Sequence, residues 1–594
     1  MIAQKTPNLD YSRLVQKSRN LAPSTSVPNF RLAIVSDAAS QQFVPLLRTL
    51  FHENGVNVEI YEGAFDAIEL EVLNPSSGLY AFRPDAIVLA NCTQALRDRY
   101  YQAGAEGFAE LSRQRTVRLW NAIQTYCSGR IVQFNFPLPY DREFGHYSLK
   151  VPQSLYASVA WLNAAMAAAA REHANVLICD VESIASSVGR RQWFDDRLWY
   201  MAKAFCRLDH LPEVAQAVVE ILLSARGRIV KCVILDLDNT LWGGVVGDDG
   251  ANGIVVGAHG DGEAFYHFQH FLRSLQRRGI LLAVCSKNDM RNAVAPFLEN
   301  PNMVLKREDI TVFVANWQNK ADNIRAIRDT LEIGFESMVF LDDNPFERNL
   351  VRQFLPDVIV PEMPEDPADY VRTICGLNLF ETASFSAEDV ARGQLYRQEA
   401  ERRELQSSFS SIDEFLQSLD MQVELAEFTK PRIPRIAQLI QRSNQFNLTT
   451  RRHNEAECEK MMLDHEQFVP LCASLSDRLG DHGLISIVIL RRNGRELAIT
   501  DWLMSCRVLK RGVEQFLMNR VAEIATHEGF KTITGEYRPT AKNGMVKDFF
   551  AQFGFEVAAE DDQGTRWRLE TSAYHPKATY VRESKVEAQW TAIQ

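Results

Sequence analysis

Four short polar segments of the sequence have residue types suited to phosphoryl transfer: DLDNT at 236–240, CSKND at 285–289, QNKADN at 318–323 and FLDDNP at 340–345. The carboxylate of Asp236 can attack phosphorus in line. Asp238 lies two residues further on and therefore on the same side of an extended segment, where it can exchange a proton with the leaving oxygen. We predict Asp236 as nucleophile and Asp238 as general acid.

The other polar residues of these segments suit a phosphate and its counter-ion. A serine can donate a hydrogen bond to the transferring group, a lysine can neutralise it, and carboxylates bind Mg²⁺, which prefers hard oxygen ligands. The predicted cofactor is Mg²⁺, held by Asp236, Asp238, Asp342 and Asp343. The predicted phosphate-binding residues are Thr240, Ser286, Asn288 and Lys320.

Three of the four segments end or closely follow apolar runs, which predicts a parallel sheet with the segments at the carboxyl ends of its strands. Taken singly, each segment is weak evidence for a phosphate site, because Asp-x-Asp is usually a solvated turn and Asp-Asp-Asn-Pro also fits a helix start. Their order along one sheet favours a phosphate site.

Apolar runs and helix-length segments alternate along the chain, which predicts α/β domains. Residues 1–225 form the first domain, and residues 229–380 form the second, which carries the four segments. A polar stretch at 384–404 is expected to be a helical connector. Residues 385–580 form a third, mixed α+β domain, because an Asn-Gly turn at 493–494 joins two strands. Residues 581–594 are expected to be a tail.

The composition excludes several classes of function. Lys and Arg number 65 against 76 Asp and Glu in 594 residues, a formal charge of −11, which argues against a nucleic-acid partner. The ten cysteines form no CxxC pair, so a reducing, cytoplasmic location is expected. No signal peptide or apolar run long enough for a bilayer is present, so no membrane partner is expected.

The ordered segments resemble the haloacid-dehalogenase (HAD) superfamily, and the residues around them narrow the match. DLDNTLWGGVVGDDGANGIVV, CSKND and ANWQNKADNIRAI with MVFLDDNPFER resemble the FkbH-like family, over about 230–590. The resemblance implies a reaction of polyketide-type pathways that starts from 1,3-bisphosphoglycerate. It ends with a glyceryl thioester on the phosphopantetheine arm of an acyl carrier protein. Trp242 follows the nucleophile loop and fits either a packed flap or substrate shaping.

The third domain resembles the acetyltransferase (GNAT) pattern Arg/Gln-x-x-Gly-x-Gly/Ala, in which helix-start N–H groups cradle a pantetheine phosphate. Arg507, Lys510 and Gly512 match it, with lysine in place of the first glycine. RSNQFNLTTRR and EYRPTAKNGMVKDFF also resemble the FkbH-like carboxyl domain. Asn444 and Asn543 are predicted to orient the acyl group's hydroxyls, with a cap or turn role as the equal alternative.

A mixed acyl phosphate keeps its activation only if a thiolate attacks the acyl carbon, so the reaction requires a cysteine. Cys285 precedes Ser286, but neighbouring side chains of a strand point to opposite faces, which counts against it. Cys506 lies beside cations and a helix start, both of which lower the pKa of a thiol. We favour Cys506 over Cys285; that both are small buried strand residues is the third possibility.

The first domain faintly resembles SGNH-type hydrolases, with Ser36, Asn91 and His210 as candidate residues. Ser-Asp-Ala replaces the expected Gly-Asp-Ser, so we expect a degenerate module for docking or dimerisation. The alternative function for the whole chain is a Mg²⁺-dependent phosphatase of a sugar or other metabolite. A docking scaffold with little turnover is a third. The sequence does not decide between glyceryl and lactyl.

Overall fold

The computed structural model describes residues 9–21, 29–385, 389, 409, 411–505, 508–540, 542–561 and 564–584. Its contacts divide the chain into two compact units, Met1–Ala225 with Glu381–Ala383 and Arg226–Phe380 with Ser384–Gln594. No helix among the described residues is long and apolar enough to cross a bilayer. Most of the connector predicted at 384–404 lies outside the described residues.

The first unit holds a five-stranded parallel sheet of order β2-β1-β3-β4-β5. Its elements are α1 Tyr11–Asn20, β1 Phe30–Ser36, α2 Val44–Glu53, β2 Val58–Glu62, α3 Ile68–Val72, α4 Gly78–Ala81, β3 Ala86–Ala90, α5 Thr93–Ala103, α6 Phe108–Tyr126, β4 Arg130–Phe134, α7 Leu155–Ala170, β5 Val176–Cys179, α8 Val181–Val188, α9 Arg190–Trp193, α10 Asp196–Ala202 and α11 Leu211–Ala225.

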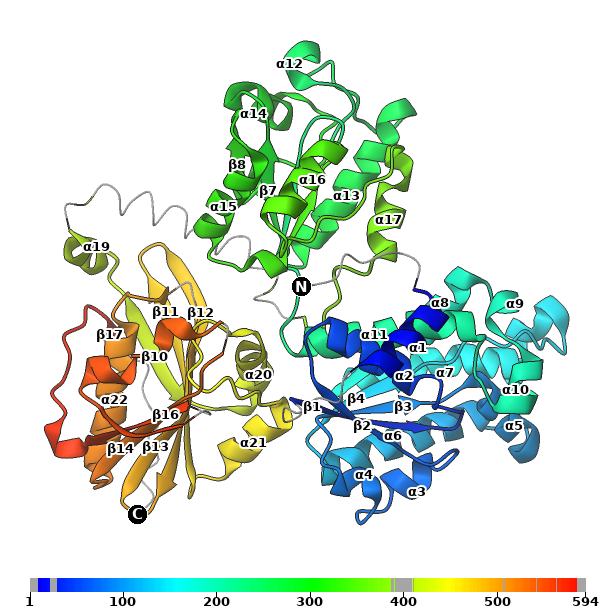
Figure 1. The fold of residues 1–594 in the computed structure, drawn as a ribbon, viewed down its shortest axis with the longest axis horizontal. Coiled ribbons are helices and arrows are strands. Elements are labelled where there is room, and N and C mark those ends of the chain that lie inside the picture. Colours follow the sequence, from blue (N-terminus) through cyan, green and yellow to red (C-terminus); the bar gives the residue numbers. More distant parts are fainter. Residues whose placement is uncertain are drawn as a thin grey trace. The chain divides into compact units, whose positions relative to one another are not determined.

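Helices cover both faces of this sheet (Figure 1). Alternate residues of β1 belong to two separate cores: Leu32 and Ile34 pack with α2 and α11, and Ala33 and Val35 pack with α6 and α7. Because both faces are buried, the strands are almost wholly apolar. The α/β class expected for this region is confirmed, and the finer SGNH-type assignment stays a prediction.

The second sheet has four parallel strands in the order β8-β7-β6-β9. It is also covered on both faces, so β6 lies at the centre of a buried layer. Its elements are β6 Cys232–Leu235, α12 Val246–Asp249, α13 Glu263–Arg277, β7 Leu281–Ser286, α14 Met290–Glu299, β8 Val312–Ala315, α15 Lys320–Leu331, β9 Met338–Leu341, α16 Pro345–Phe354 and α17 Tyr370–Gly376.

The third sheet is mixed, with eight strands in the order β15-β16-β14-β13-β12-β11-β10-β17. The Asn-Gly turn joins β12 to β13 as an antiparallel pair, and α22 is the crossover between the parallel strands β13 and β14. The elements are α19 Ile412–Ser418, β10 Gln422–Glu427, α20 Ile433–Arg442, α21 Glu455–Leu463, β11 Phe468–Asp477, β12 Gly480–Asn493, β13 Glu496–Met504, α22 Val513–His527, β14 Thr532–Tyr537, β15 Glu556–Asp561, β16 Gly564–Glu570 and β17 Arg582–Glu583.

A short segment, residues 446–448, lies between the ends of β13 and β14, and its Asn447 forms an isolated bridge with Leu503. The pairing of these strands stops at Ile499 and Gly535. Beyond that point the Leu448 N–H donates to Trp502 O (3.0 Å), and Leu448 O accepts from the Arg538 N–H (2.8 Å). Residues 446–448 therefore form hydrogen bonds with backbone groups that the diverging strands would otherwise leave unpaired.

The expected tail begins as ordered structure. β17, at Arg582–Glu583, pairs in parallel with Gln422 and Val423 of β10 at the edge of the third sheet. The third domain therefore extends a few residues past the predicted limit at 580. The sequence did not signal this, because a two-residue edge strand has no detectable alternation.

Candidate functional site

The nucleophile loop follows the central strand of the four-stranded sheet. The residues of β6 are fully buried, and Asp236 continues the pairing through its N–H, which donates to Leu341 O of β9 (3.0 Å). Asn239 then adopts a left-handed conformation with φ 53°, which asparagine tolerates better than most residues, and this turns the chain. Tyr370 supports the turn by donating to Asn239 O (3.0 Å).

The two aspartates that follow β9, Asp342 and Asp343, are held by hydrogen bonds from the start of α16. Asp342 Oδ1 accepts from the Asn344 N–H (2.8 Å), which begins α16. Arg348, one turn into α16, donates through Nη1 to the backbone oxygens of Asp342 (2.8 Å) and Asp343 (2.7 Å). Arg348 was not among the predicted site residues, because an arginine in a helix gives no sequence signal for a backbone contact.

Lys320, the first residue of α15, brings the two strand ends together. Its Nζ lies 3.0 Å from Asp236 Oδ1 and 2.6 Å from Asp342 Oδ2, and its side chain is 3% exposed. Burial alone would lower the pKa of Lys320, but attraction to Asp236 and Asp342 outweighs it and raises the pKa. The ammonium is therefore charged and held between two carboxylates.

Three carboxylates form a group able to hold a metal ion. One carboxylate oxygen each of Asp236, Asp342 and Asp343 lies within 4.8 Å of the other two. Burial, followed by repulsion from Asp236, raises the pKa of both Asp342 and Asp343. Three carboxylates face one ammonium here, so a divalent cation would relieve an excess of buried negative charge. The donor set fits Mg²⁺.

The side chain of Asp238 is not part of this group, which corrects the predicted fourth metal ligand. Its Oδ1 accepts from Trp242 Nε1 (2.9 Å) and from the Val246 N–H (3.0 Å), and its Oδ2 accepts from Asn288 Nδ2 (3.1 Å). Burial raises the pKa of Asp238, although the hydrogen bonds from Val246 and Trp242 oppose the shift. A raised pKa and a fixed orientation suit a general acid.

Thr240, Asn288 and Trp242 make hydrogen bonds to carboxylates of the site. Thr240 accepts from the Asp343 N–H (3.1 Å) and donates to Asp343 Oδ1 (3.3 Å), so it positions a metal-site carboxylate. Asn288 and Trp242 hold Asp238, and the Trp242 ring is fully buried against Phe297. These contacts cross between loops that are separate in the sequence, so spacing could not reveal them.

Ser286 ends β7, on the strand beside β6, and is 2% exposed. Cys285 precedes it and points to the opposite face, where it packs with Ile234, Ala283 and Ile324. Its thiol contacts Lys320 O at 3.7 Å, and burial raises its pKa. A protonated thiol enclosed in a core does not fit an acyl tether, as the strand alternation predicted.

Two strand ends, one lysine and an acidic trio thus define a HAD-like α/β protein. Residues 31–223 match the FkbH N-terminal domain. The N-terminal part of protein BF1531 from Bacteroides fragilis, described as containing a phosphatase domain and complexed with Mg, is 40% identical. The match covers 64% of this chain and 100% of that one, with a TM-score of 0.60. The chain belongs to the FkbH family.

The remaining comparisons are weaker. No curated protein matches the chain. The PaiA N-acetyltransferase from Thermoplasma acidophilum, in complex with coenzyme A, matches 25% of this chain and 99% of its own at 10% identity and a TM-score of 0.21. The ribosomal-protein-S18-alanine N-acetyltransferase from Escherichia coli is 14% identical. The match covers 25% of this chain and 91% of that one, with a TM-score of 0.20. Similarity at this level carries no functional conclusion.

The loop before α22, predicted to cradle a pantetheine phosphate, already contacts a carboxyl group of the chain. Lys510 adopts a left-handed conformation with φ 61°, and its N–H donates to Glu514 Oε1 (3.0 Å). Glu514 is buried in the first turn of α22, and burial raises its pKa. The side chain of Glu514 thus accepts from a backbone N–H that the prediction assigned to a ligand. In the same loop, Thr579 donates to Gly512 O (2.7 Å).

Both predicted hydroxyl-orienting asparagines make hydrogen bonds within the chain. Asn543 is fully buried: its Nδ2 donates to Asn447 O (2.9 Å) and Arg538 O (2.8 Å), and its Oδ1 accepts from the Thr540 N–H (2.7 Å). Asn444 Oδ1 accepts from Arg452. The turn alternative therefore holds for Asn543. Cys506 and Arg507 lie outside the described residues, so their predicted roles stay predictions.

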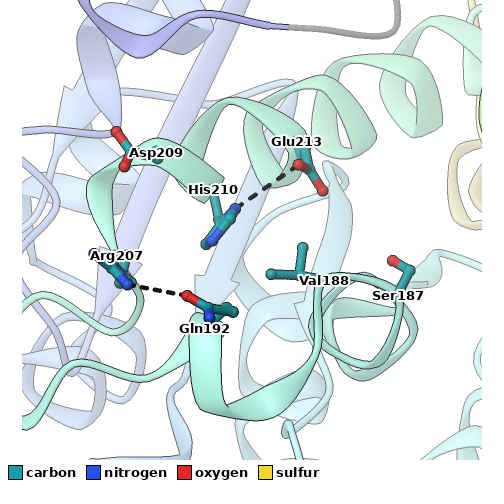
Figure 2. A pocket seen from close by; sticks show the side chains of 7 residues that line it. All are labelled: Ser187, Val188, Gln192, Arg207, Asp209, His210 and Glu213. Atoms are coloured by element: carbon teal, nitrogen blue, oxygen red, sulfur yellow. Dashed lines mark hydrogen bonds and ion pairs between the residues drawn. The ribbon is translucent and has the colours of Figure 1, made fainter.

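The candidate residues of the first unit are not joined in one contact network. Ser36 Oγ donates to Ala90 O (2.9 Å) and accepts from the Ala38 N–H (3.0 Å). Asn91 donates to Asp37 Oδ2 (3.1 Å). His210 instead lines a surface pocket of about 540 Å³ and has Glu213 at 3.9 Å (Figure 2). Among the described contacts of Ser36, none is to a base.

Replacing Asn543 by alanine is expected to destabilise the third domain, because it leaves several buried backbone groups without partners. The cost should be roughly 2–3 kcal/mol. Hydrogen exchange of the β14 amides measures it locally, and exchange should accelerate. The exposed Gln467→Ala is the control. A variant with normal exchange that only weakens acyl binding would instead assign Asn543 to the substrate.

Glu514→Gln should change how stability depends on pH. The pKa of Glu514 is raised in the folded state. At a pH just above the ordinary pKa of a carboxyl group, the folded state therefore binds more protons than the unfolded state. The stability of the wild type consequently falls as the pH rises through that window. The Tm of wild type minus that of Glu514→Gln should therefore decrease from pH 4.5 upward. Glu523→Gln, on the exposed face of α22, should show no such trend. A difference in Tm that does not change with pH would contradict the raised pKa of the buried Glu514 carboxyl group.

Proposed function

We propose that the chain loads a glyceryl unit from 1,3-bisphosphoglycerate onto an acyl carrier protein and removes the ester phosphate with Mg²⁺. The observation that carries the phosphatase half is the buried group of Asp236, Lys320, Asp342 and Asp343, with Asp238 oriented beside it. Membership of the FkbH family and the Mg-bound phosphatase domain of its 40% identical relative support the same assignment.

The phosphatase step follows from the chain's own residues. A carboxylate oxygen of Asp236 attacks phosphorus, the bond to the ester oxygen breaks, and Asp238 gives that oxygen its proton. Water then attacks the aspartyl phosphate, with Asp238 as base, which releases phosphate and restores Asp236. Lys320 compensates the charge of the phosphoryl group. A Mg²⁺ ion at Asp236, Asp342 and Asp343 would supply further charge stabilisation.

The acyl step requires a thiol. Attack of Asp236 on the acyl phosphorus would leave a free carboxylate and discard the activation. A thiolate that attacks the acyl carbon retains it as a thioester and expels phosphate with the bonding electrons. Cys285 is enclosed in the core of the second sheet, so we assign the tether to Cys506. The carrier's phosphopantetheine thiol then takes the acyl group.

A second candidate is a Mg²⁺-dependent phosphatase of a sugar or other metabolite. It is favoured by the third domain, where Glu514 accepts from the N–H expected to bind a phosphate and residues 446–448 lie between the ends of β13 and β14. Both features reduce the space for a pantetheine arm on that side of the domain. The phosphate site itself would be the same.

Asp236→Asn separates the two steps. With Mg²⁺ and 1,3-bisphosphoglycerate, the variant should still form a hydroxylamine-labile adduct, but intact-mass spectrometry should show that the adduct retains its phosphate. Removal of the ester phosphate should fall by roughly a thousandfold or more, as for loss of a nucleophile, whereas the acyl phosphate is still released when the adduct forms. The exposed Asp248→Asn is the matched control and should behave as wild type.

A glyceryl adduct without phosphate on Asp236→Asn would contradict the role of Asp236. If wild type forms no adduct and hydrolyses p-nitrophenyl phosphate efficiently, the second candidate is correct. An adduct that is lost on Cys506→Ala supports the proposed tether.

A further inference from the structure

A second ion pair crosses the phosphate site, between the loop after β7 and the start of α16. Lys287 follows Ser286, the last residue of β7, and its Nζ lies 2.6 Å from Glu347 Oε1 in the first turn of α16. In the sheet, β6 lies between β7 and β9, the strand that leads to α16. The side chain of Lys287 therefore reaches across the carboxyl end of β6, which Asp236 follows.

Both chain neighbours of Lys287 are bound to other loops of the site. Ser286 O accepts from the Asn316 N–H (3.2 Å) in the loop before α15. Asn288 Nδ2 donates to Asp238 Oδ2 (3.1 Å). The backbone on either side of Lys287 is thus held to the loop that leads to α15 and to the general acid. The position from which the lysine side chain extends is therefore fixed relative to the phosphate site.

Lys287 differs from Lys320 in its access to solvent. Lys320 is 3% exposed and held between Asp236 and Asp342, where it compensates the transferring phosphoryl group. The side chain of Lys287 is 35% exposed, and among the described contacts its ammonium has one partner, Glu347 Oε1. An ammonium has three donors. The Lys287 ammonium therefore has donors left for a ligand on the solvent side of the site.

We propose that Lys287, held by Glu347, binds a second anionic group of the substrate and thereby determines specificity; this rests on the phosphatase half of the proposed function. The phosphoryl group lies against Asp236 and Lys320, and the rest of the substrate extends past Lys287 towards solvent. A carboxylate or a second phosphate there accepts charge-assisted hydrogen bonds from the ammonium. The preferred substrates are therefore small phosphate esters with a second anion, as in 1,3-bisphosphoglycerate, and not esters of neutral sugars.

A matched pair of substrates tests the proposal on the full-length protein with Mg²⁺. 3-Phosphoglycerate and glycerol 3-phosphate differ only in that a carboxylate replaces a hydroxymethyl group. The kcat/KM of the wild type should be about tenfold or more higher for 3-phosphoglycerate. Because the second anion is bound equally in the ground state and the transition state, the difference should lie in KM. Propane-1,3-diol bisphosphate, compared with its monophosphate, asks the same question of a second phosphate.

Lys287→Gln should lower the ratio of the two kcat/KM values to about one, because the charged donor is lost. Arg277→Gln removes an exposed cation at the end of α13 and is the control, which should keep the wild-type ratio. Glu347 is 6% exposed, so Lys287→Gln alone leaves a buried carboxylate without its cation and can destabilise the fold. The double variant Lys287→Gln, Glu347→Gln avoids this by a neutral hydrogen-bonding pair and should show the same loss of preference.

A wild-type ratio near or below one, or no turnover of 3-phosphoglycerate, would overturn the proposal. A ratio unchanged in either folded variant would overturn it as well. If an acyl adduct forms with 1,3-bisphosphoglycerate while the ratio does not depend on Lys287, the proposed function stands and this specificity is wrong. If no adduct forms but the ratio depends on Lys287, the proposed acyl reaction fails and the assignment of Lys287 stands.

Discussion

The ammonium of Lys320, held between Asp236 and Asp342, is the interaction on which the phosphate site depends. It joins two carboxylates that follow different strands, β6 and β9, and all three residues are almost fully buried. Without this cation, two carboxylates would face each other in a region of low dielectric, and one would have to take up a proton. The parallel sheet makes the arrangement available because its strand ends meet at one edge.

The predictable part of the site is what local sequence determines. Apolar runs predicted all four strands around it, and the polar residues at their ends predicted Asp236, Lys320, Asp342 and Asp343 as one group. The alternation of β7 also predicted that Cys285 would turn away from Ser286. Each of these follows from a period of two along a strand or from the position at which a strand ends.

The unpredicted part consists of contacts between distant loops. Asn288 and Trp242 donate hydrogen bonds to Asp238, and Thr240 donates a hydrogen bond to Asp343. In the third domain a side-chain oxygen of Glu514 accepts a hydrogen bond from the loop that the pattern assigned to a ligand. A side-chain carboxylate can satisfy the same donors as a bound phosphate, so a sequence pattern for anion binding cannot distinguish the two.

The most direct test of the phosphate site is a crystal structure with Mg²⁺ and beryllofluoride, a mimic of a phosphoryl group on a carboxylate. We predict beryllium bonded to a carboxylate oxygen of Asp236, the Lys320 ammonium against the fluorines, and the cation between Asp236 and Asp342. Beryllofluoride bound elsewhere, or Asp236, Lys320 and Asp342 facing separate cavities, would contradict the account.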